Sequence, residues 1–361
     1  MKWKEQILNL KAYQPGKSID EVKKMFNLEK ITKLASNENP FGCSPVVNQM
    51  LQSYQPLRSL YPDGYAAKLR EATAEFLNVS ERQLIFGNGS DEIIQIISRA
   101  LLKPGVNTIM PAPSFPQYRH NAIIEGAEIR EVPLVDGAHD LSSMLAQIDE
   151  ATAVVWLCSP NNPSGKYINE QGLVGFLNKV PDDILVVLDE AYYEYVVADD
   201  YYDSLELVKK HENLLVLRTF SKIYGLASFR VGYGFGQENL VQTLEPVREP
   251  FNTNVLGQAA AAAAIQDQDF VHACKEENRK GLEQFYQFCR EHNLTYFPSQ
   301  GNFILIDFNR DGDEVFQFLL SEGYIVRSGQ ALGYPTCVRV TVGSAEQNNG
   351  VIESMKKLWN A

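Results

Sequence analysis

The sequence predicts an α/β protein whose core is a mainly parallel sheet covered by helices. Short, continuously apolar runs alternate with helical patterns along the chain, and each run ends in turn or polar residues. Strands that are apolar throughout are buried on both faces, as they are in parallel sheets with helices on either side. The predicted strands lie at residues 107–113, 153–160, 183–192 and 213–221.

Two stretches between or after these strands predict helices. From Ser90 onward, Ile93, Ile97 and Leu101 recur on one face, and Pro104-Gly105 ends the pattern. The alanine-rich run at 257–266 predicts a second helix, because alanine has the highest helix propensity. We expect this helix to lie near a junction between two domains.

Composition limits the class of protein. The 361 residues are 45% hydrophobic, enough for a large core and more consistent with two domains than with one. A net charge of −12 without a local basic patch disfavours nucleic acids and anionic membranes as partners. The five cysteines form no C-x-x-C pair, which favours reduced thiols over disulfides or a zinc site. The start of the chain is too polar for a signal peptide, and no apolar stretch approaches the roughly 18 residues of a membrane span, so we expect a soluble cytoplasmic protein that binds a small molecule.

Polar residues follow the predicted strands, at the edge of the sheet where α/β proteins bind ligands. Asn162 lies in the loop after residues 153–160, although turn chemistry alone explains an Asn-Pro-Gly loop. Asp189 leaves the run at 184–188, and a carboxylate there is costly unless a cation or hydrogen-bond donors meet it. The cation would be either Mg²⁺ with a nucleotide or a protonated pyridine nitrogen.

Nucleotide binding requires motifs that this chain lacks in complete form. A P-loop needs Gly-x-x-x-x-Gly-Lys-Ser/Thr after a strand, but at Gly16-Lys17-Ser18 the first glycine position holds Lys11 and no strand precedes it. The dinucleotide fingerprint at 87–92 lacks its third glycine. A magnesium-dependent nucleotide-binding protein using Asp189 and Glu190 therefore remains a remote alternative.

Lys222 follows the strand at 213–221 and lies among Phe220, Ile223 and Tyr224. Such surroundings and a nearby cation disfavour the ammonium form, lower the pKa, and make the amine available as a nucleophile and base. These are the properties that a Schiff-base lysine needs.

Side chains close to Lys222 in the sequence, and the start of the helix predicted from Ser90, could together hold a phosphate. Thr219 and Ser221 offer hydroxyls, and Arg230 offers a bidentate cation. Gly89 allows free backbone N–H groups at the start of the helix, where the dipole favours an anion. Asp91 would be unfavourable beside a phosphate unless, as an N-cap, it turned onto its own helix.

The order of these motifs resembles the fold-type I pyridoxal 5′-phosphate enzymes of aminotransferase class I/II. The motifs are Gly89-Ser90-Asp91, Asn162-Pro163, Asp189-x-x-Tyr192, Ser221-Lys222 and Arg230, and Asn162, Asp189, Lys222 and Arg230 are 27, 33 and 8 residues apart. Segments from Tyr13 to Ser344, including YQPGK, LASNENPFG, CSPNNPSGKYI and VVLDEAYYEY, are similar to the histidinol-phosphate aminotransferases. The resemblance implies an N-terminal arm at 1–30, a large domain at 31–250 with a seven-stranded, mainly parallel sheet, and a smaller C-terminal α/β domain at 251–361.

The resemblance also implies roles in binding pyridoxal 5′-phosphate. Lys222 would form the Schiff base and move the proton, and Asp189 would keep the pyridine nitrogen protonated. Asn162 and Tyr192 would bind the phenolic oxygen of the ring, and Tyr118, chosen over Phe115 on the family alone, would stack on its face. The phosphate would be held by Gly89, Ser90, Asp91, Thr219, Ser221, Arg230 and, from a second subunit, Tyr61.

Substrate groups are expected from the C-terminal part. Val338, Val340 and Val342 alternate with Arg339 and Thr341, so a half-buried strand would present the guanidinium to the cleft. By resemblance, Arg339 would clamp the carboxylate of glutamate with Arg327 as its partner, although Arg327 could instead form an ordinary salt bridge. Tyr13 and Asn37 complete the set of substrate residues implied by the family.

The activity implied by the resemblance is that of an aminotransferase in histidine biosynthesis. The active unit would be a homodimer, because Tyr61 would act across the interface. Histidinol phosphate and 2-oxoglutarate would give imidazole-acetol phosphate and glutamate in a ping-pong cycle. An aromatic-amino-acid aminotransferase is the nearest alternative, and a non-catalytic binding protein that kept the fold is another.

Overall fold

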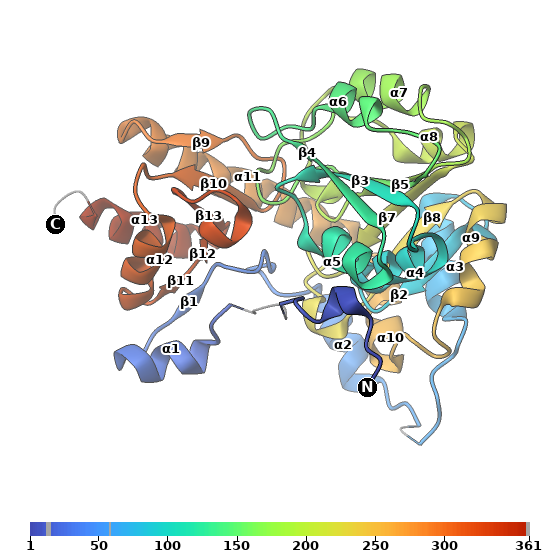
Figure 1. Cartoon of the computed structure of the whole chain (residues 1–361). Helices are drawn as coiled ribbons and strands as arrows, with labels where there is room; N and C mark the ends of the chain where they lie inside the picture. Colours follow the sequence, from blue (N-terminus) through green and yellow to red (C-terminus); the bar gives the residue numbers. More distant parts are fainter. Residues whose placement is uncertain (12–15, 58, 359–361) are drawn as a thin grey trace.

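The computed structural model describes residues 1–11, 16–57 and 59–358. Figure 1 shows a large lobe built around one sheet and a smaller lobe formed by the C-terminal elements. The chain begins beside the large lobe, and α1 (Ile19–Phe26) lies below the small one. None of the helices in these ranges is both long and apolar enough to cross a membrane.

The large lobe contains the predicted seven-stranded, mainly parallel sheet. Its strand order is β2-β8-β7-β6-β5-β3-β4, and only β8 runs antiparallel to its neighbours β2 and β7. Four of these strands, β3, β5, β6 and β7, match the predicted ones. The bounds are β2 (Leu84–Gly87), β3 (Asn107–Ala112), β4 (Glu128–Pro133), β5 (Thr152–Cys158), β6 (Leu185–Asp189), β7 (Leu214–Thr219) and β8 (Gly232–Gly236).

Two apolar clusters pack on opposite faces of this sheet. Successive residues of β5 belong to different clusters, with Val155 and Leu157 on one face and Val154 and Trp156 on the other. This two-sided burial explains why the strands are apolar throughout. The helices of this lobe are α2 (Pro45–Ser53), α3 (Ala67–Leu77), α4 (Ser90–Leu101), α5 (Pro116–Glu125), α6 (Leu141–Ala146), α7 (Glu170–Leu177), α8 (Ser204–Lys210), α9 (Glu238–Leu244) and α10 (Val255–Ala264).

The small lobe has an antiparallel sheet in the order β12-β13-β10-β9. Its elements are β9 (Thr295–Phe297), β10 (Phe303–Asp307), β12 (Arg327–Ser328) and β13 (Cys337–Thr341), with α11 (Gln268–Glu291), α12 (Gly312–Ser321) and α13 (Ala345–Lys357). β1 (Thr32–Lys33) pairs in parallel with β11 (Tyr324–Ile325). This pairing attaches the N-terminal segment to the small lobe. Short 3-10 helices lie at η1 (Glu5–Ile7), η2 (Glu81–Gln83), η3 (Tyr193–Tyr195), η4 (Ala227–Phe229), η5 (Glu245–Val247) and η6 (Gln330–Leu332).

Packing bears on the predicted domain limits. The predicted alanine-rich helix is confirmed as α10, and it packs on α2 and α3 of the large lobe. Its Ala260 and Ala261 belong to the large core, as does Cys274 on the first turns of α11. At the other end, Leu34 packs in the core of the small lobe. We therefore propose a boundary within α11 rather than at residue 250, with the segment around β1 assigned to the small lobe.

Candidate active site

The carboxyl ends of the parallel strands and the small lobe enclose a cavity of about 330 Å³. This volume suits a small molecule of cofactor size. The cavity brings together most residues that the sequence singled out, although they come from widely separated segments. Its lining includes Asn37, Gly89, Ser90, Asp91, Asn162, Asp189, Tyr192, Thr219, Ser221, Lys222, Arg230, Arg327 and Arg339.

Lys222 lies just beyond β7, with its amine turned inward. Its Nζ donates a hydrogen bond to the carbonyl oxygen of Ser36 at 3.2 Å and lies 5.7 Å from the centre of the Tyr192 ring. Burial, followed by the positive charge of Arg339, lowers the pKa of Lys222 to about 8. The amine is therefore unprotonated more often near neutral pH than that of an ordinary lysine, which is the direction expected from the sequence.

Asp189 is the last residue of β6 and is 3% exposed. Its Oδ2 accepts a hydrogen bond from the Tyr118 hydroxyl at 2.7 Å, and its Oδ1 accepts one from the Ala191 N–H at 3.2 Å. No lysine or arginine of the described residues forms a salt bridge with this carboxylate. Burial raises its pKa to about 6, so the ionised form lacks the cation that would normally compensate its desolvation.

A second part of the cavity is suited to an anion. Gly89 precedes α4 with a φ of +75°, and a Cβ there would lie 2.7 Å from a guanidinium nitrogen of Arg230. Arg230 donates to the Ser221 hydroxyl at 3.3 Å and pairs with the Asp91 carboxylate at 3.2 Å. The predicted N-cap role of Asp91 is wrong, because Gly89 occupies the N-cap and the Asp91 side chain turns to Arg230 instead.

The small lobe contributes two arginines on neighbouring strands. Arg327 of β12 and Arg339 of β13 are directly opposite one another in the antiparallel register. Arg339 donates to the carbonyl oxygen of Ala35 at 2.7 Å and to the side-chain oxygen of Asn162. Within the described residues no carboxylate pairs with Arg327, so an ordinary salt bridge is not observed. Like charges placed opposite one another are unfavourable unless an anion lies near them.

The strand pattern around Arg339 is confirmed. Val338, Val340 and Val342 pack in the small-lobe core, whereas Arg339 lines the cavity. Thr341 points to the same side as Arg339, and its hydroxyl donates to the side chain of Asn37 at 3.1 Å.

Asn37 connects the two lobes at the cavity. It is 1% exposed, and its amide donates to the Tyr192 hydroxyl at 2.9 Å. The amide of Asn302 donates to its carbonyl oxygen at 3.0 Å. Burial raises the pKa of the Tyr192 phenol above its ordinary value, so this hydroxyl stays protonated and remains available as a donor.

Tyr118 has a different place from the one predicted. It is completely buried, and its ring stacks on Trp156 with a centroid distance of 4.9 Å and an interplanar angle of 14°. Phe115, which immediately precedes α5, lines the cavity instead. The cavity wall therefore contains Phe115 where the prediction placed Tyr118, and the Tyr118 hydroxyl lies on Asp189 instead. Pro116 was the sequence signal for this difference, because proline favours the first position of a helix. It places Phe115 before α5 and Tyr118 inside it.

Among the described residues, Tyr61 was also predicted for the site but does not line this cavity. Tyr61 is 81% exposed and stacks on Phe251 at a centroid distance of 4.7 Å. Tyr13 lies outside the described residues.

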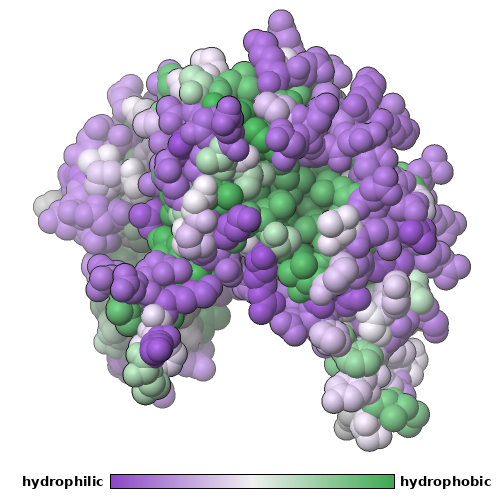
Figure 2. Space-filling model, turned by 45° about the vertical axis from the view of Figure 1, so that its right-hand side comes forward, coloured by the Kyte–Doolittle hydropathy of each residue, from purple (hydrophilic) through white to green (hydrophobic). Residues whose placement is uncertain are grey.

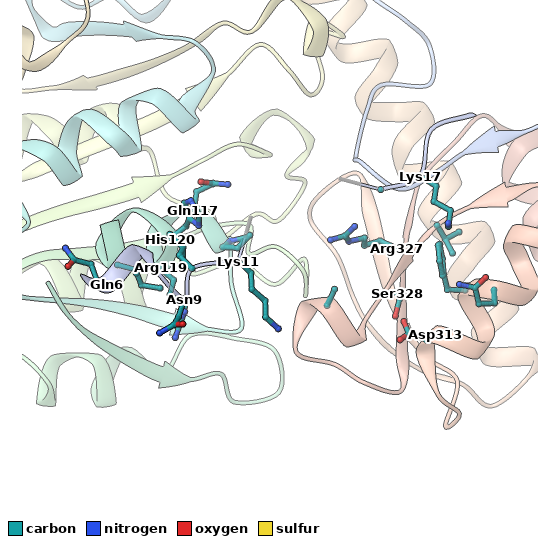
Figure 3. A pocket seen from close by; sticks show the side chains of 18 residues that line it. Gln6, Asn9, Lys11, Lys17, Gln117, Arg119, His120, Asp313, Arg327 and Ser328 are labelled. Carbon is teal, nitrogen blue, oxygen red and sulfur yellow. The ribbon is translucent and has the colours of Figure 1, made fainter. Parts of the chain in front are cut away.

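An outer cavity of about 1140 Å³ adjoins the first, and both are lined by Gly16, Pro116, Arg327 and Ala331. Figure 3 shows its walls, with Arg119, His120 and Lys11 on one side and Arg327 and Lys17 on the other. Asp313 is the one carboxylate among the described lining residues. The mouth of the site is thus basic, although the chain as a whole carries a net charge of −12.

Glu190 takes no part in this arrangement. Its carboxylate is completely buried and pairs with Arg218 at 2.8 Å. The part of the chain that the structure describes also contains no cluster of three or more His, Cys, Asp or Glu residues suited to a metal ion. The second carboxylate on which the magnesium-nucleotide hypothesis depended is therefore committed to a structural ion pair.

Comparison with known proteins agrees with this geometry. Residues 29–355 match the family Aminotransferase class I and II, and the chain belongs to that family. It is 60% identical over 358 residues to the histidinol-phosphate aminotransferase of Anoxybacillus flavithermus, covering 99% of this chain and 96% of that protein. It is 57% identical over 359 residues to the histidinol-phosphate aminotransferase of Bacillus subtilis, covering 99% of this chain and all of that protein.

The fold is also found in solved structures. The histidinol-phosphate aminotransferase of Sinorhizobium meliloti, solved in complex with pyridoxal 5′-phosphate, superposes with a TM-score of 0.88 at 24% identity. That comparison covers 99% of this chain and 98% of the other. The predicted fold, a large domain with a mainly parallel seven-stranded sheet and a smaller α/β domain, is confirmed.

Proposed function

We propose that this aminotransferase uses pyridoxal 5′-phosphate to transfer the amino group of histidinol phosphate to 2-oxoglutarate. The observation that carries the proposal is one cavity lined by three features. These are Lys222, whose pKa is lowered; the buried Asp189 carboxylate, which no cation of the described residues pairs with; and two arginines at opposite positions of neighbouring strands. The similarity to named histidinol-phosphate aminotransferases supports the choice of substrate.

The cavity residues fit the cofactor. When bound, pyridoxal 5′-phosphate supplies an aldehyde that condenses with amines and a ring that withdraws electrons. The Asp189 carboxylate would receive the protonated ring nitrogen as its missing cation, and Lys222 would provide the amine. The Phe115 ring is available for the ring face, and Asn162 and Tyr192 for the phenolic oxygen.

The phosphate would lie at the start of α4. This position offers the N–H groups of Ser90 and Asp91, the helix dipole, and the guanidinium of Arg230. Thr219 and Ser221 line the same cavity with their hydroxyls. A phosphate bound there would compete with Asp91 for Arg230.

Arg327 and Arg339 would bind the anionic groups of the two substrates in turn. Guanidinium groups match carboxylate and phosphate by bidentate hydrogen bonds, so one pair of arginines can serve both. While substrate is held there, the Lys222 amine would accept and return the proton at the substrate carbon. Asn37 would support the substrate side by holding Tyr192, and the role of Tyr13 stays a prediction.

We further propose a cytoplasmic homodimer in which Tyr61 completes the partner's site. Hydrophobic residues gather at the tip of the right-hand projection in Figure 2. Leu57, Leu60 and Tyr61 are 73%, 65% and 81% exposed, and Phe251 beside Tyr61 is 45% exposed. Exposed apolar surface of this kind favours association with a partner.

Lys222→Ala tests the proposal. We expect turnover and the absorbance of the lysine-linked cofactor to be lost, whereas the matched Lys166→Ala variant should retain both. Retention of both by Lys222→Ala would reject the assignment. Competition between histidinol phosphate, phenylalanine and tyrosine then separates the proposed substrate from aromatic amino acids.

A further inference from the structure

Tyr118 contacts the proposed cofactor site through another residue. It is absent from the residues lining the cavity, and its hydroxyl donates to Asp189 Oδ2 at 2.7 Å. Asp189 does line the cavity. Tyr118 therefore contacts Asp189 from outside the cavity lining.

The position of the Tyr118 hydroxyl is fixed by its surroundings. Its ring stacks on Trp156, and the Trp156 indole N–H donates to the Thr108 hydroxyl at 2.9 Å. That hydroxyl donates in turn to the carbonyl oxygen of Val154 at 2.9 Å, so the support reaches the central sheet. Phe115 also packs edge to face against Tyr118, with ring centroids 5.6 Å apart. A phenol held in this way keeps its donor aimed at one carboxylate oxygen.

The proton of this hydrogen bond belongs to the tyrosine. Burial and the nearby Asp189 charge raise the pKa of the Tyr118 phenol well above its ordinary value. Among the described residues, the charged groups that most affect the Asp189 pKa are Asp91 and Glu190, which are both acids, and burial raises the pKa of the nearby Cys158 thiol of β5. Within the part of the chain that the structure describes, Tyr118 and the Ala191 N–H are thus the donors to Asp189.

We propose that Tyr118 is a positioning residue that keeps Asp189 ionised and oriented toward the cavity, and thereby sets how strongly a cationic heteroaromatic ring is held there. The inference rests on the proposed role of Asp189 in the site. With Oδ2 occupied by Tyr118 and Oδ1 partly occupied by Ala191, the remaining acceptor capacity of the carboxylate is left for the ring nitrogen.

Tyr118→Phe is the direct test, because it retains the ring on Trp156 and removes only the hydroxyl. In the cofactor-free protein the carboxyl pKa of Asp189, followed by ¹³C NMR and assigned with Asp189→Asn, should rise by about one unit. In the loaded enzyme the dissociation constant of pyridoxal 5′-phosphate should rise several-fold and kcat should fall, while KM for 2-oxoglutarate stays constant. Tyr202→Phe removes another buried hydroxyl, one that contacts Tyr201, and should change none of these values.

The outcomes separate this inference from the proposed function. An unchanged Asp189 pKa and an unchanged cofactor dissociation constant in Tyr118→Phe would overturn the role of Tyr118. If Asp189→Asn also bound the cofactor as tightly as the wild type, the proposed site itself would fail. If Tyr118→Phe did not fold, 3-fluorotyrosine at position 118 would provide a second test. Its phenol is more acidic but similar in size, so it should donate a stronger hydrogen bond and lower the Asp189 pKa; an unchanged pKa would again overturn the role of Tyr118.

Discussion

Replacing Asp189 by asparagine should stabilise the cofactor-free protein at neutral pH. Burial raises the pKa of this carboxyl from 3.8 to about 6. When folding raises the pKa of a carboxyl, the free energy of unfolding is highest below the pKa of the unfolded state. It falls as the pH rises through the pKa of the folded state. Above pH 6 the ionised carboxylate therefore lowers the free energy of unfolding by about 3 kcal/mol. An asparagine, which carries no charge, has no such effect.

Urea unfolding of the two cofactor-free proteins at pH 7.5 and pH 4 measures this effect. We expect Asp189→Asn to raise the free energy of unfolding by about 3 kcal/mol at pH 7.5 and by about 0.5 kcal/mol at pH 4. Asp140→Asn is a control of opposite sign. Hydrogen bonds, first from the Ser143 hydroxyl, lower the pKa of Asp140 to about 2, so its replacement should destabilise the protein at neutral pH.

Saturating cofactor should reverse the order of the wild type and Asp189→Asn. The wild-type carboxylate then has its cation, and tighter binding to the folded state adds stability by mass action. A cofactor-free Asp189→Asn protein that was less stable than the wild type at pH 7.5, or equally stabilised at both pH values, would refute the account of Asp189 as an uncompensated buried charge.

Three further substitutions test other parts of the site. Gly89→Ala places a Cβ against Arg230 at a φ of +75°, so the dissociation constant of the cofactor, measured by fluorescence titration, should rise roughly ten-fold or more. Glu190→Gln leaves Arg218 buried without its anion and should lower the free energy of unfolding by about 3 kcal/mol, whereas unchanged stability would contradict the ion pair. Lys17→Ala should lower kcat/KM for 2-oxoglutarate and weaken its dependence on salt without changing kcat, and an identical salt dependence would exclude steering by the outer cavity.

Much of the site could be predicted because backbone geometry alone places residues at the ends of parallel strands. Asp189 ends an apolar run and Lys222 follows another, and both face one cavity because β6 and β7 are neighbours in the sheet. The alternation around Arg339 likewise fixed which face of β13 reaches the cavity. Local pattern was sufficient wherever a side-chain direction followed from strand periodicity.

Directions that depend on packing between elements could not be predicted in this way. Phe115 and Tyr118 are both aromatic; Pro116 separates the first from the helix, but the contact of the second with Trp156 depends on how α5 packs against the sheet. The side chain of Asp91 turned from its helix to Arg230, a residue far away in the sequence. The limit of the large domain also depended on contacts of α10 that no residue pattern records.

The site keeps charges in arrangements that folding alone does not favour. Asp189 is buried without a cation among the described residues, and Arg327 lies opposite Arg339 in the register of the neighbouring strands β12 and β13. Each arrangement raises the free energy of the folded, cofactor-free protein, because a desolvated anion and like charges at opposite positions of neighbouring strands are both unfavourable. A ligand with a cationic ring and substrates with anionic groups would remove both costs when bound. The free-energy cost of these buried charges and the affinity of the site for ligands of opposite charge thus come from the same side chains. Substitutions such as Asp189→Asn should therefore stabilise the cofactor-free protein while they weaken its function.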